Sequence, residues 1–159
     1  MGLVKLRVAS SQSVDDHAAA FRDALKKPEA GILVQEMVQD GVEVVLSCLR
    51  DTDFGPVLTI GLGGIGIELF RDVAHLALPI DETQVRAALQ KLKLATLLAG
   101  FRGKPAADID ALTAAAVRFS DLFLAMPDIA EFEINPLFVL PAGQGLRAVD
   151  ALISLKPGK

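Results

Sequence analysis

Oxygen-bearing side chains recur at strand spacing near the end of the chain. In the stretch EFEINPLFV (131–139), Glu131, Glu133 and Asn135 occupy every second position, so a β-strand presents all three on one face. The alternate positions carry apolar side chains that suit a core, namely Phe132, Ile134 and Phe138. The pattern therefore predicts two carboxylates and one amide oxygen on a shared face, opposite the core.

A turn is expected to return the chain beside this strand. The residues PAGQG (141–145) have turn chemistry, and a turn centred near Gly143 places Asp150 opposite Asn135 or Pro136. Like charges that converge in this way are unfavourable unless a cation neutralises them. Mg²⁺ does so, because it binds through one or two carboxylates together with phosphate oxygens. Three acidic or amide oxygen groups, from this strand face and from Asp150, are therefore expected to converge at the end of one hairpin and could bind a magnesium ion.

Asp150 adds to this hypothesis because it interrupts the apolar run AVDALI (148–153). A buried carboxylate is costly unless it has a partner. The alternative is an ordinary solvated strand face, with Asp150 at the margin of a sheet. Spacing alone leaves both interpretations open.

The composition predicts a globular domain, or at most two small lobes. The chain has 159 residues, of which 52% are hydrophobic, and a net charge of −4. It contains neither Tyr nor Trp and no basic cluster, which argues against a nucleic-acid partner. No apolar run reaches the roughly 18 residues of a membrane span. The single cysteine, Cys48, excludes an internal disulfide and fits a reducing, cytoplasmic compartment. Its apolar surroundings predict a buried, inert thiol.

The first forty residues predict a strand, a helix and a second strand. Residues 3–9 alternate like a strand that begins abruptly, which suggests that the chain is the second part of something larger. Ser13 is a candidate N-cap for a helix that stops before Pro28. Residues 31–38 read as a buried strand. The apolar positions of the helix are Ala18, Phe21 and Leu25.

A turn at residues 39–41 and a further apolar strand at 42–50 complete a predicted hairpin with 31–38. Glu36 and Glu43 lie on either side of that turn. They are either solvated charges or a pair that grips a polar ligand with a sugar and an exocyclic amine.

The glycines at residues 61–66 follow a short predicted strand and have G-x-G-x-x-G spacing. A Rossmann unit also needs a long helical crossover to a parallel strand, and only about ten residues follow here. A nicotinamide-dependent oxidoreductase is therefore the weaker alternative. Gly63 and Gly64 are better read as a loop whose backbone passes close to something, with phosphate as one candidate, or as a simple tight turn.

Two helices are expected in the second half of the chain. One runs from a near capping box at Asp81 and Gln84 to about residue 99, and the other spans about 108–126. Between them, Arg102 lies in a glycine-flanked loop, where it could reach an anion or remain an ordinary surface arginine. The apolar stripes, which we read as core, are Val85, Ala88, Leu89, Leu92, Ala95 and Ala99 in the first helix, and Ile109, Leu112, Ala116, Phe119, Phe123 and Met126 in the second.

Four stretches, in this order, resemble the ATP-grasp domain of ADP-forming acyl-CoA synthetases, the group that includes acetyl-CoA synthetase and the succinyl-CoA synthetase β-subunit. They are GILVQEMVQDGVE (31–43), RDTDFGPVLTIGLGGIGIELFRD (50–72), LLAGFRGKPAADIDAL (97–112) and EFEINPLFV with AVDA (131–139 and 148–151). Each piece alone is unspecific, whereas FGPV, GLGGI, GFRGKP and EINPL in this order are specific.

The resemblance implies roles for matched residues. Residues 35–38 would contact adenine, with Glu36 near its amine, and Glu43 would bind the ribose hydroxyls. The E-x-N-P motif and a later aspartate would hold Mg²⁺ against the phosphates. They match Glu133, Asn135 and Asp150, which agrees with the hairpin argument given above. The residues implied in binding ATP or ADP are Gln35, Glu36, Met37, Val38 and Glu43; Gly63, Gly64 and Arg102 join them as candidates from their own local patterns.

The expected fold is α+β: a mixed or antiparallel sheet with packed helices, forming the C-terminal lobe of an ATP-grasp domain over residues 1–159. The resemblance implies that the first lobe, with its phosphate-contacting lysine, is missing. The CoA-binding and CoA-ligase domains, with the histidine that carries phosphate, would be missing as well. Neither His17 nor His75 matches that histidine.

The implied parent reaction is the reversible ligation of a carboxylic acid to CoA, coupled to ATP and ADP through acyl-phosphate and phosphohistidine intermediates. The chain alone is expected to bind ATP or ADP and Mg²⁺ without catalysing this reaction. CoA-binding domains or a separate subunit would be its partners, and an exposed apolar face makes self-association plausible. The alternative is a non-catalytic nucleotide-sensing module of an acyltransferase.

Overall fold

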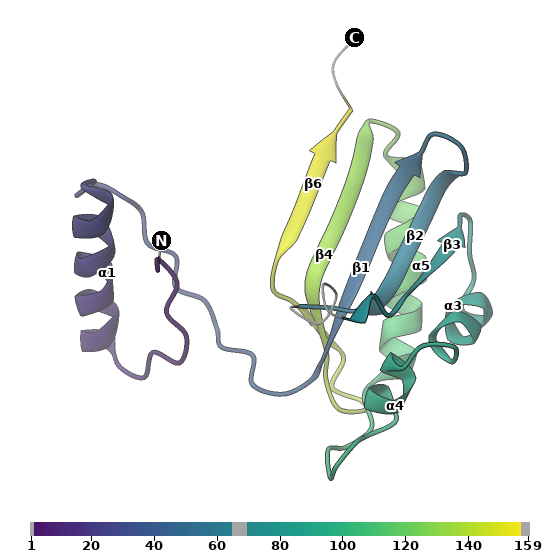
Figure 1. Ribbon diagram of the computed structural model, residues 1–159, viewed down its shortest axis with the longest axis horizontal. Helices are drawn as coiled ribbons and strands as arrows, with labels where there is room; N and C mark the ends of the chain where they lie inside the picture. Colours follow the sequence, from purple (N-terminus) through teal and green to yellow (C-terminus); the bar gives the residue numbers. More distant parts are fainter. Residues whose placement is uncertain (1, 65–69, 157–159) are drawn as a thin grey trace. The chain divides into compact units, whose positions relative to one another are not determined.

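The computed structural model describes residues 2–64 and 70–156, which form two compact units, residues 1–39 and 40–159. Figure 1 shows their helices and strands. In chain order these are α1 (Ser11–Leu25), β1 (Val42–Asp51), β2 (Gly55–Leu62), β3 (Val73–Ala77), α3 (Glu82–Leu89), α4 (Leu94–Leu98), α5 (Ile109–Ala125), β4 (Ile129–Val139), β5 (Leu146–Ala148) and β6 (Ala151–Leu155).

The first unit contains the predicted helix, which begins three residues earlier than expected. The N-cap of α1 is Ser10, whose hydroxyl accepts a hydrogen bond from the backbone N–H of Ser13 at 3.2 Å. The helix ends at Lys26, whose φ of 53° is left-handed, so it stops before Pro28 as predicted. Ser13 therefore supplies a donor to the cap and is not the cap itself.

The prediction of two strands in this unit is wrong. Residues 2–9 and 28–39 contain no strand, and the apolar side chains expected to be buried are exposed, with Leu33 at 80% and Val34 at 66%. A strand gains its stability from a paired neighbour. Both edges of β1, the strand expected to pair with residues 31–38, are already occupied, one by β2 and the other by β4. Alternation in the sequence could not reveal that competition.

The second unit is built on an antiparallel sheet in the order β3-β2-β1-β4-β5, with β6 also paired to β4 (Figure 1). This agrees with the α+β prediction. Because β2 and β3 are antiparallel neighbours, the glycines at the end of β2 do not open a parallel β-α-β crossover. The oxidoreductase alternative therefore loses its structural basis.

The hydrophobic core lies between one face of this sheet and helices α3, α4 and α5. Alternate residues of β1 point into it, and Val44, Leu46 and Cys48 are at most 1% exposed. The helices contribute Val85, Leu89, Leu94, Leu98, Leu112, Ala116, Phe119 and Phe123. Burial raises the pKa of the Cys48 thiol to about 12, which confirms the prediction of an inert cysteine.

The alternation of buried and outward-facing residues in β4 shifts by one position part of the way along the strand. Phe132 packs against Phe119 of α5, as expected, with ring centroids 4.5 Å apart. Past Asn135 the pairing with β1 shifts register, so Leu137 and Val139 are buried instead of Phe138. An irregularity of this kind reverses which residues face the core. It makes the prediction for Phe138 wrong.

The helix predicted for residues 81–99 is broken into α3 and α4. Its start is confirmed, because Asp81 and Gln84 form a complete capping box. At the break, the Asp72 carboxylate accepts hydrogen bonds from the backbone N–H groups of Lys93 (3.0 Å) and Leu94 (2.7 Å), which begins a new helix. The phase shift buries Leu94 and Leu98 in α4 in place of the predicted Ala95 and Ala99.

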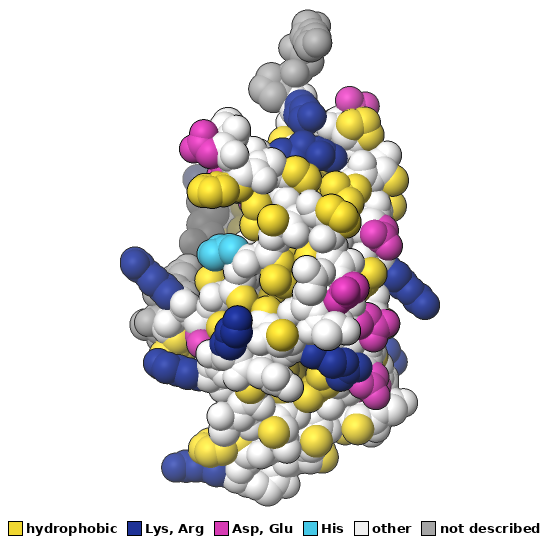
Figure 2. All heavy atoms as spheres, turned by 90° about the vertical axis from the view of Figure 1, so that its right-hand side faces the viewer, with side chains coloured by type: hydrophobic (Ala, Val, Ile, Leu, Met, Phe, Trp, Pro, Cys, Tyr) yellow, Lys and Arg dark blue, Asp and Glu magenta, His cyan; other side chains and the backbone are white. Residues whose placement is uncertain are grey.

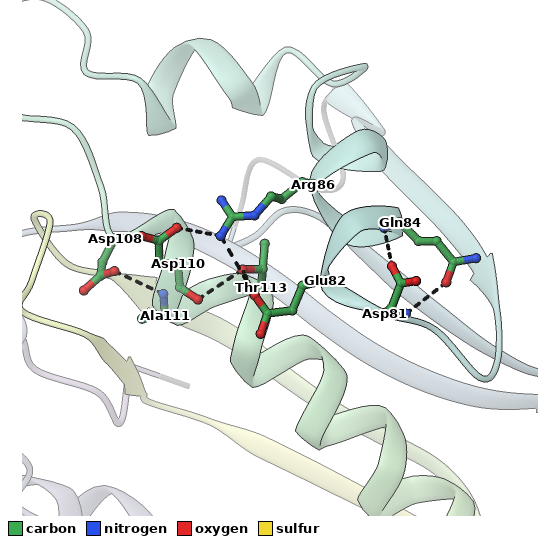
Figure 3. A network of polar contacts seen from close by, with 8 residues as sticks. All are labelled: Asp81, Glu82, Gln84, Arg86, Asp108, Asp110, Ala111 and Thr113. Carbon is green, nitrogen blue, oxygen red and sulfur yellow. Dashed lines mark hydrogen bonds and ion pairs between the residues drawn. The ribbon is translucent and has the colours of Figure 1, made fainter.

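The predicted helix over 108–126 is confirmed as α5, with Asp108 as its N-cap. Figure 3 shows how α5 is tied to α3: Arg86 pairs with Asp110, and Thr113 donates to Glu82 at 3.4 Å. On the face shown in Figure 2, basic and acidic side chains are interspersed among apolar and uncharged atoms. Within residues 2–64 and 70–156, no helix is both long and apolar enough to cross a bilayer.

Candidate functional site

A cavity of about 650 Å³ opens at the end of the sheet where β1 begins and β2 and β4 end. The loop after α4 closes its other side. Most of its walls are apolar, which suits a ring system with a few polar anchor points. The lining residues are Asp40, Gly41, Val42, Glu43, Leu62, Gly63, Leu97, Phe101, Arg102, Lys104, Pro105, Ala107, Val139 and Pro141.

Three of the predicted nucleotide-binding residues line this cavity: Glu43, Gly63 and Arg102. Arg102 has a left-handed φ of 50°, and its guanidinium carbon lies 5.4 Å from the centre of the Phe101 ring. Lys104 adds a second cation that sequence reasoning missed. Its only signal was its place two residues beyond Arg102 in the same glycine-containing loop. Two carboxylates (Asp40 and Glu43) and two cations in one mostly apolar cavity can bind a ligand that combines hydroxyl groups with an anion.

Gly63 and Gly64 pass close to β1, as the sequence predicted for a glycine loop. The Gly63 N–H donates to the Glu43 carbonyl oxygen at 3.0 Å, and a Cβ on Gly63 would lie 2.5 Å from the carbonyl carbon of Val44. A Cβ on Gly64, whose φ is +59°, would collide with the Glu43 carboxylate. The loop therefore holds Glu43 in place without blocking it. Residues 65–69 of the same glycine motif lie outside the described residues.

Gly64 also connects Glu43 to the predicted magnesium ligands. Its backbone N–H donates a hydrogen bond of 2.8 Å to the Asn135 side-chain oxygen Oδ1. An amide oxygen has a second lone pair, so Asn135 remains able to ligate a cation. Residues from β1, the glycine loop and β4 are thus brought together at one end of the sheet.

The expected hairpin geometry at Asp150 is present. The Asn135 N–H donates to the Asp150 carbonyl oxygen at 3.1 Å, and the Val149 N–H donates to the Pro136 carbonyl at 3.2 Å. Asp150 sits between β5 and β6, where the returning strand is interrupted. Its side chain is exposed, so the argument from a buried carboxylate was wrong. It lies at a sheet margin, open to a ligand from solvent.

Glu133, the third predicted magnesium ligand, lies on β4 two residues before Asn135. The register pairs Glu133 with Leu152 of β6 and Ser47 of β1, so its backbone is not opposite Asp150. In the part of the chain that the structure describes, no three His, Cys, Asp or Glu side chains form a metal-binding group. The donor set fits a cation that takes one carboxylate and one amide oxygen and completes its shell with phosphate and water, as Mg²⁺ does.

The predicted adenine-contacting residues lie in the other unit of the chain. Residues 35–38 (Gln35, Glu36, Met37 and Val38) have no regular secondary structure, and the strand predicted for them is absent. Glu36 and Glu43 are therefore not partners across a hairpin, as the sequence suggested.

Known proteins resemble this chain over most of its length. A family model described as an ATP-grasp domain matches residues 1–155. The β subunit of the ADP-forming acetate–CoA ligase II of Pyrococcus furiosus is 37% identical over 149 residues, which cover 91% of this chain and 61% of that subunit. The ADP-forming 4-hydroxybutyrate–CoA ligase of Nitrosopumilus maritimus is 31% identical over 162 residues, covering 97% and 23%.

A solved structure is similar along almost the whole chain. Acetyl-coenzyme A synthetase 1 of Ca. Korarchaeum cryptofilum, in complex with coenzyme A and Mg-AMPPCP, matches with a TM-score of 0.83 and 35% identity. The match covers 96% of this chain and 67% of that one. This chain thus spans 61% and 23% of the lengths of the two curated relatives described above.

Proposed function

The chain belongs to the ATP-grasp family of domains, and from this we propose that it is the nucleotide- and magnesium-binding lobe of an ADP-forming acyl-CoA synthetase. The reaction would ligate a carboxylic acid to CoA while ATP and ADP interconvert. Relatives that are ADP-forming acetate and 4-hydroxybutyrate ligases support the reaction class. A relative solved with Mg-AMPPCP supports the nucleotide and the metal.

The observation that carries this proposal is the place of Gly64, which donates a hydrogen bond to Asn135 and has the Glu43 carboxylate in the space that a Cβ on Gly64 would fill. It joins a carboxylate at an apolar cavity to the amide oxygen beside Asp150. A nucleoside diphosphate needs this combination: an apolar surface for the base, a carboxylate for ribose hydroxyls, and a cation at the phosphates.

Each residue has a proposed task. Glu43 accepts hydrogen bonds from the ribose hydroxyls and Arg102 faces the phosphates, while Gly63 and Gly64, which carry no side chains, let the phosphates come close to the loop. Asn135 and Asp150 hold Mg²⁺, which offsets the charge that develops during phosphoryl transfer, and Glu133 supplies a further oxygen. From the resemblance we also propose that Gln35, Glu36, Met37 and Val38 contact adenine.

The proposed partners are the CoA-binding domains of the same enzyme, either on another subunit or elsewhere in a longer chain. The P. furiosus relative is itself a β subunit. We propose that residues 1–159 form one lobe of the ATP-grasp domain, which binds nucleotide but does not complete the reaction alone.

Calorimetric titration of the 159-residue chain with ADP, in the presence of Mg²⁺, tests the proposal, with NAD as the competing ligand. We expect ADP to bind and NAD not to bind. Glu43→Gln should raise the Kd for ADP at least about tenfold, because a charge-assisted hydrogen bond of about 1.5 kcal/mol or more is lost. Asp121→Asn, on the exposed side of α5, is the matched control and should leave the Kd unchanged. Absence of ADP binding by the unsubstituted chain would refute the proposal.

A further inference from the structure

Asp108 joins two segments that are far apart in the sequence. Its Oδ1 accepts a hydrogen bond from the Ala111 N–H at 3.1 Å, which caps α5 (Figure 3). Its Oδ2 accepts two more, from the Gly143 N–H at 2.9 Å and the Gly145 N–H at 3.0 Å. The carboxylate therefore holds the turn after β4 against the start of α5.

Backbone hydrogen bonds run alongside this bridge. The Asp108 N–H donates to the Leu140 carbonyl at 2.8 Å, and the Ala142 N–H donates to the Ala106 carbonyl at 2.9 Å. The segment before α5 and the turn after β4 are thus fastened together. Both of them line the cavity: the segment before α5 through Pro105 and Ala107, and the turn after β4 through Pro141, next to Val139 at the end of β4.

Only a carboxylate satisfies this arrangement. Three N–H donors point at two oxygens, and a side-chain amide offers one oxygen and would turn its own N–H₂ towards the remaining donors. Hydrogen bonds from Ala111 first, and then from Gly145 and Gly143, hold the pKa of Asp108 below its usual value, so the carboxylate is ionised at neutral pH.

We propose that Asp108 is a positioning residue for the nucleotide cavity: by fastening the turn at 140–145 to the loop at 104–108, it fixes two walls between which the ligand binds. This inference rests on the proposed function, since it assigns the cavity to a nucleotide. Asp108 itself does not line the cavity, so it acts through the position of its neighbours.

Two substitutions separate the bridge from the helix cap. Asp108→Asn removes the charge, and Asp108→Ser keeps a good N-cap residue but is too short to reach the turn. Asp81→Asn is the matched control, because Asp81 also caps a helix, has a single donor to its side chain in Gln84, and does not line the cavity. ADP affinity with Mg²⁺ and amide hydrogen exchange at residues 142–145 are measured for all variants.

We expect both Asp108 variants to exchange faster at residues 142–145 and to bind ADP at least about tenfold more weakly, whereas Asp81→Asn changes neither. If the Asp108→Asn variant does not fold, the ADP affinity and hydrogen exchange of the Asp108→Ser variant test the proposal. Faster exchange with unchanged ADP affinity would overturn this inference while leaving the proposed function standing, and so would unchanged exchange. Failure of the unsubstituted chain to bind ADP would instead refute the proposed function, and the assignment of these walls to a nucleotide with it.

Discussion

Gly64 is the residue on which the geometry of the site depends most. It adopts a left-handed φ, donates to Asn135, and leaves room for the Glu43 carboxylate. Any other residue at this position would be strained by the left-handed φ, and its Cβ would collide with the Glu43 carboxylate. Sequence reasoning identified the loop but not its contacts, because the G-x-G spacing says nothing about which strand the backbone approaches.

Gly64→Ala should therefore weaken ADP binding by about tenfold or more, since Glu43 must move. Gly55→Ala is the control, because Gly55 also has a positive φ but a Cβ there meets nothing within 4 Å. Both variants should lose about 1–2 kcal/mol of unfolding free energy from the left-handed conformation. Calorimetry and urea unfolding measure the two effects, and equal ADP affinity in the two variants would contradict this account.

Cys48 offers a second test at the same scale. With a pKa of about 12, about one thiol in ten thousand is ionised at pH 8. The thiolate is the reactive form, so the folded protein should not react with a disulfide reagent at pH 8. The denatured chain should react at once. Rapid modification of the folded protein would show that β1 is not buried as described.

Among the elements, the end of β1 is joined to the end of α5 by the side chain of Arg50. Its Nε donates to the Ile129 carbonyl at 2.9 Å, and its Nη2 donates to the Phe123 carbonyl at 2.8 Å. The guanidinium also lies 4.5 Å from the centre of the Phe123 ring. A planar group with several donors is needed for all of these contacts.

Arg50→Lys should lower the free energy of unfolding by about 1–2 kcal/mol, because lysine replaces a fork of hydrogen bonds with a point charge. Urea denaturation measures the change. Arg118→Lys, on the exposed side of α5, should stay within about 0.5 kcal/mol of the unsubstituted protein. Equal stability of the two variants would exclude a structural role for Arg50.

The elements that local chemistry specifies were predicted well. The capping box at Asp81 and Gln84, the start of a helix near Asp108 and the turn at 141–145 each depend on residues close in sequence. Three features were missed: the break before α4, the register shift in β4 and the absence of strands in residues 2–39. Each depends on a distant partner, such as Asp72 for α4 or β4 for the edge of β1.

At the scale of the whole molecule, the site draws on elements that the sequence separates widely. Glu43 is the second residue of β1, Gly64 follows β2, and Asn135 lies within β4. Antiparallel pairing of these strands brings the three positions together. The resemblance predicted Glu43 and Asn135, and the glycine pattern predicted Gly64. The cavity and its second cation, Lys104, come from the packing of the loop after α4. Spacing along the chain carries no information about that packing.

The expected activity of the chain is limited by how much of its relatives it spans. The chain spans 61% of a relative that is itself one subunit of a ligase, so we expect no acyl-CoA formation from the 159-residue chain alone. Activity should return when CoA-binding domains of a relative are added, as a coupled assay for ADP would detect. Acyl-CoA formation by the chain alone would contradict the proposed division of labour. Nucleotide binding without any restored activity would favour a sensing module.

The central claim is that Asn135 and Asp150 hold a magnesium ion against a bound nucleotide. The most direct test is the Kd for ADP with and without Mg²⁺, in the unsubstituted chain, in Asn135→Ala/Asp150→Ala, and in Asp121→Ala as control. We predict that Mg²⁺ tightens ADP binding at least about tenfold in the first and third proteins and has no effect in the double variant. An undiminished magnesium effect in the double variant would contradict the claim.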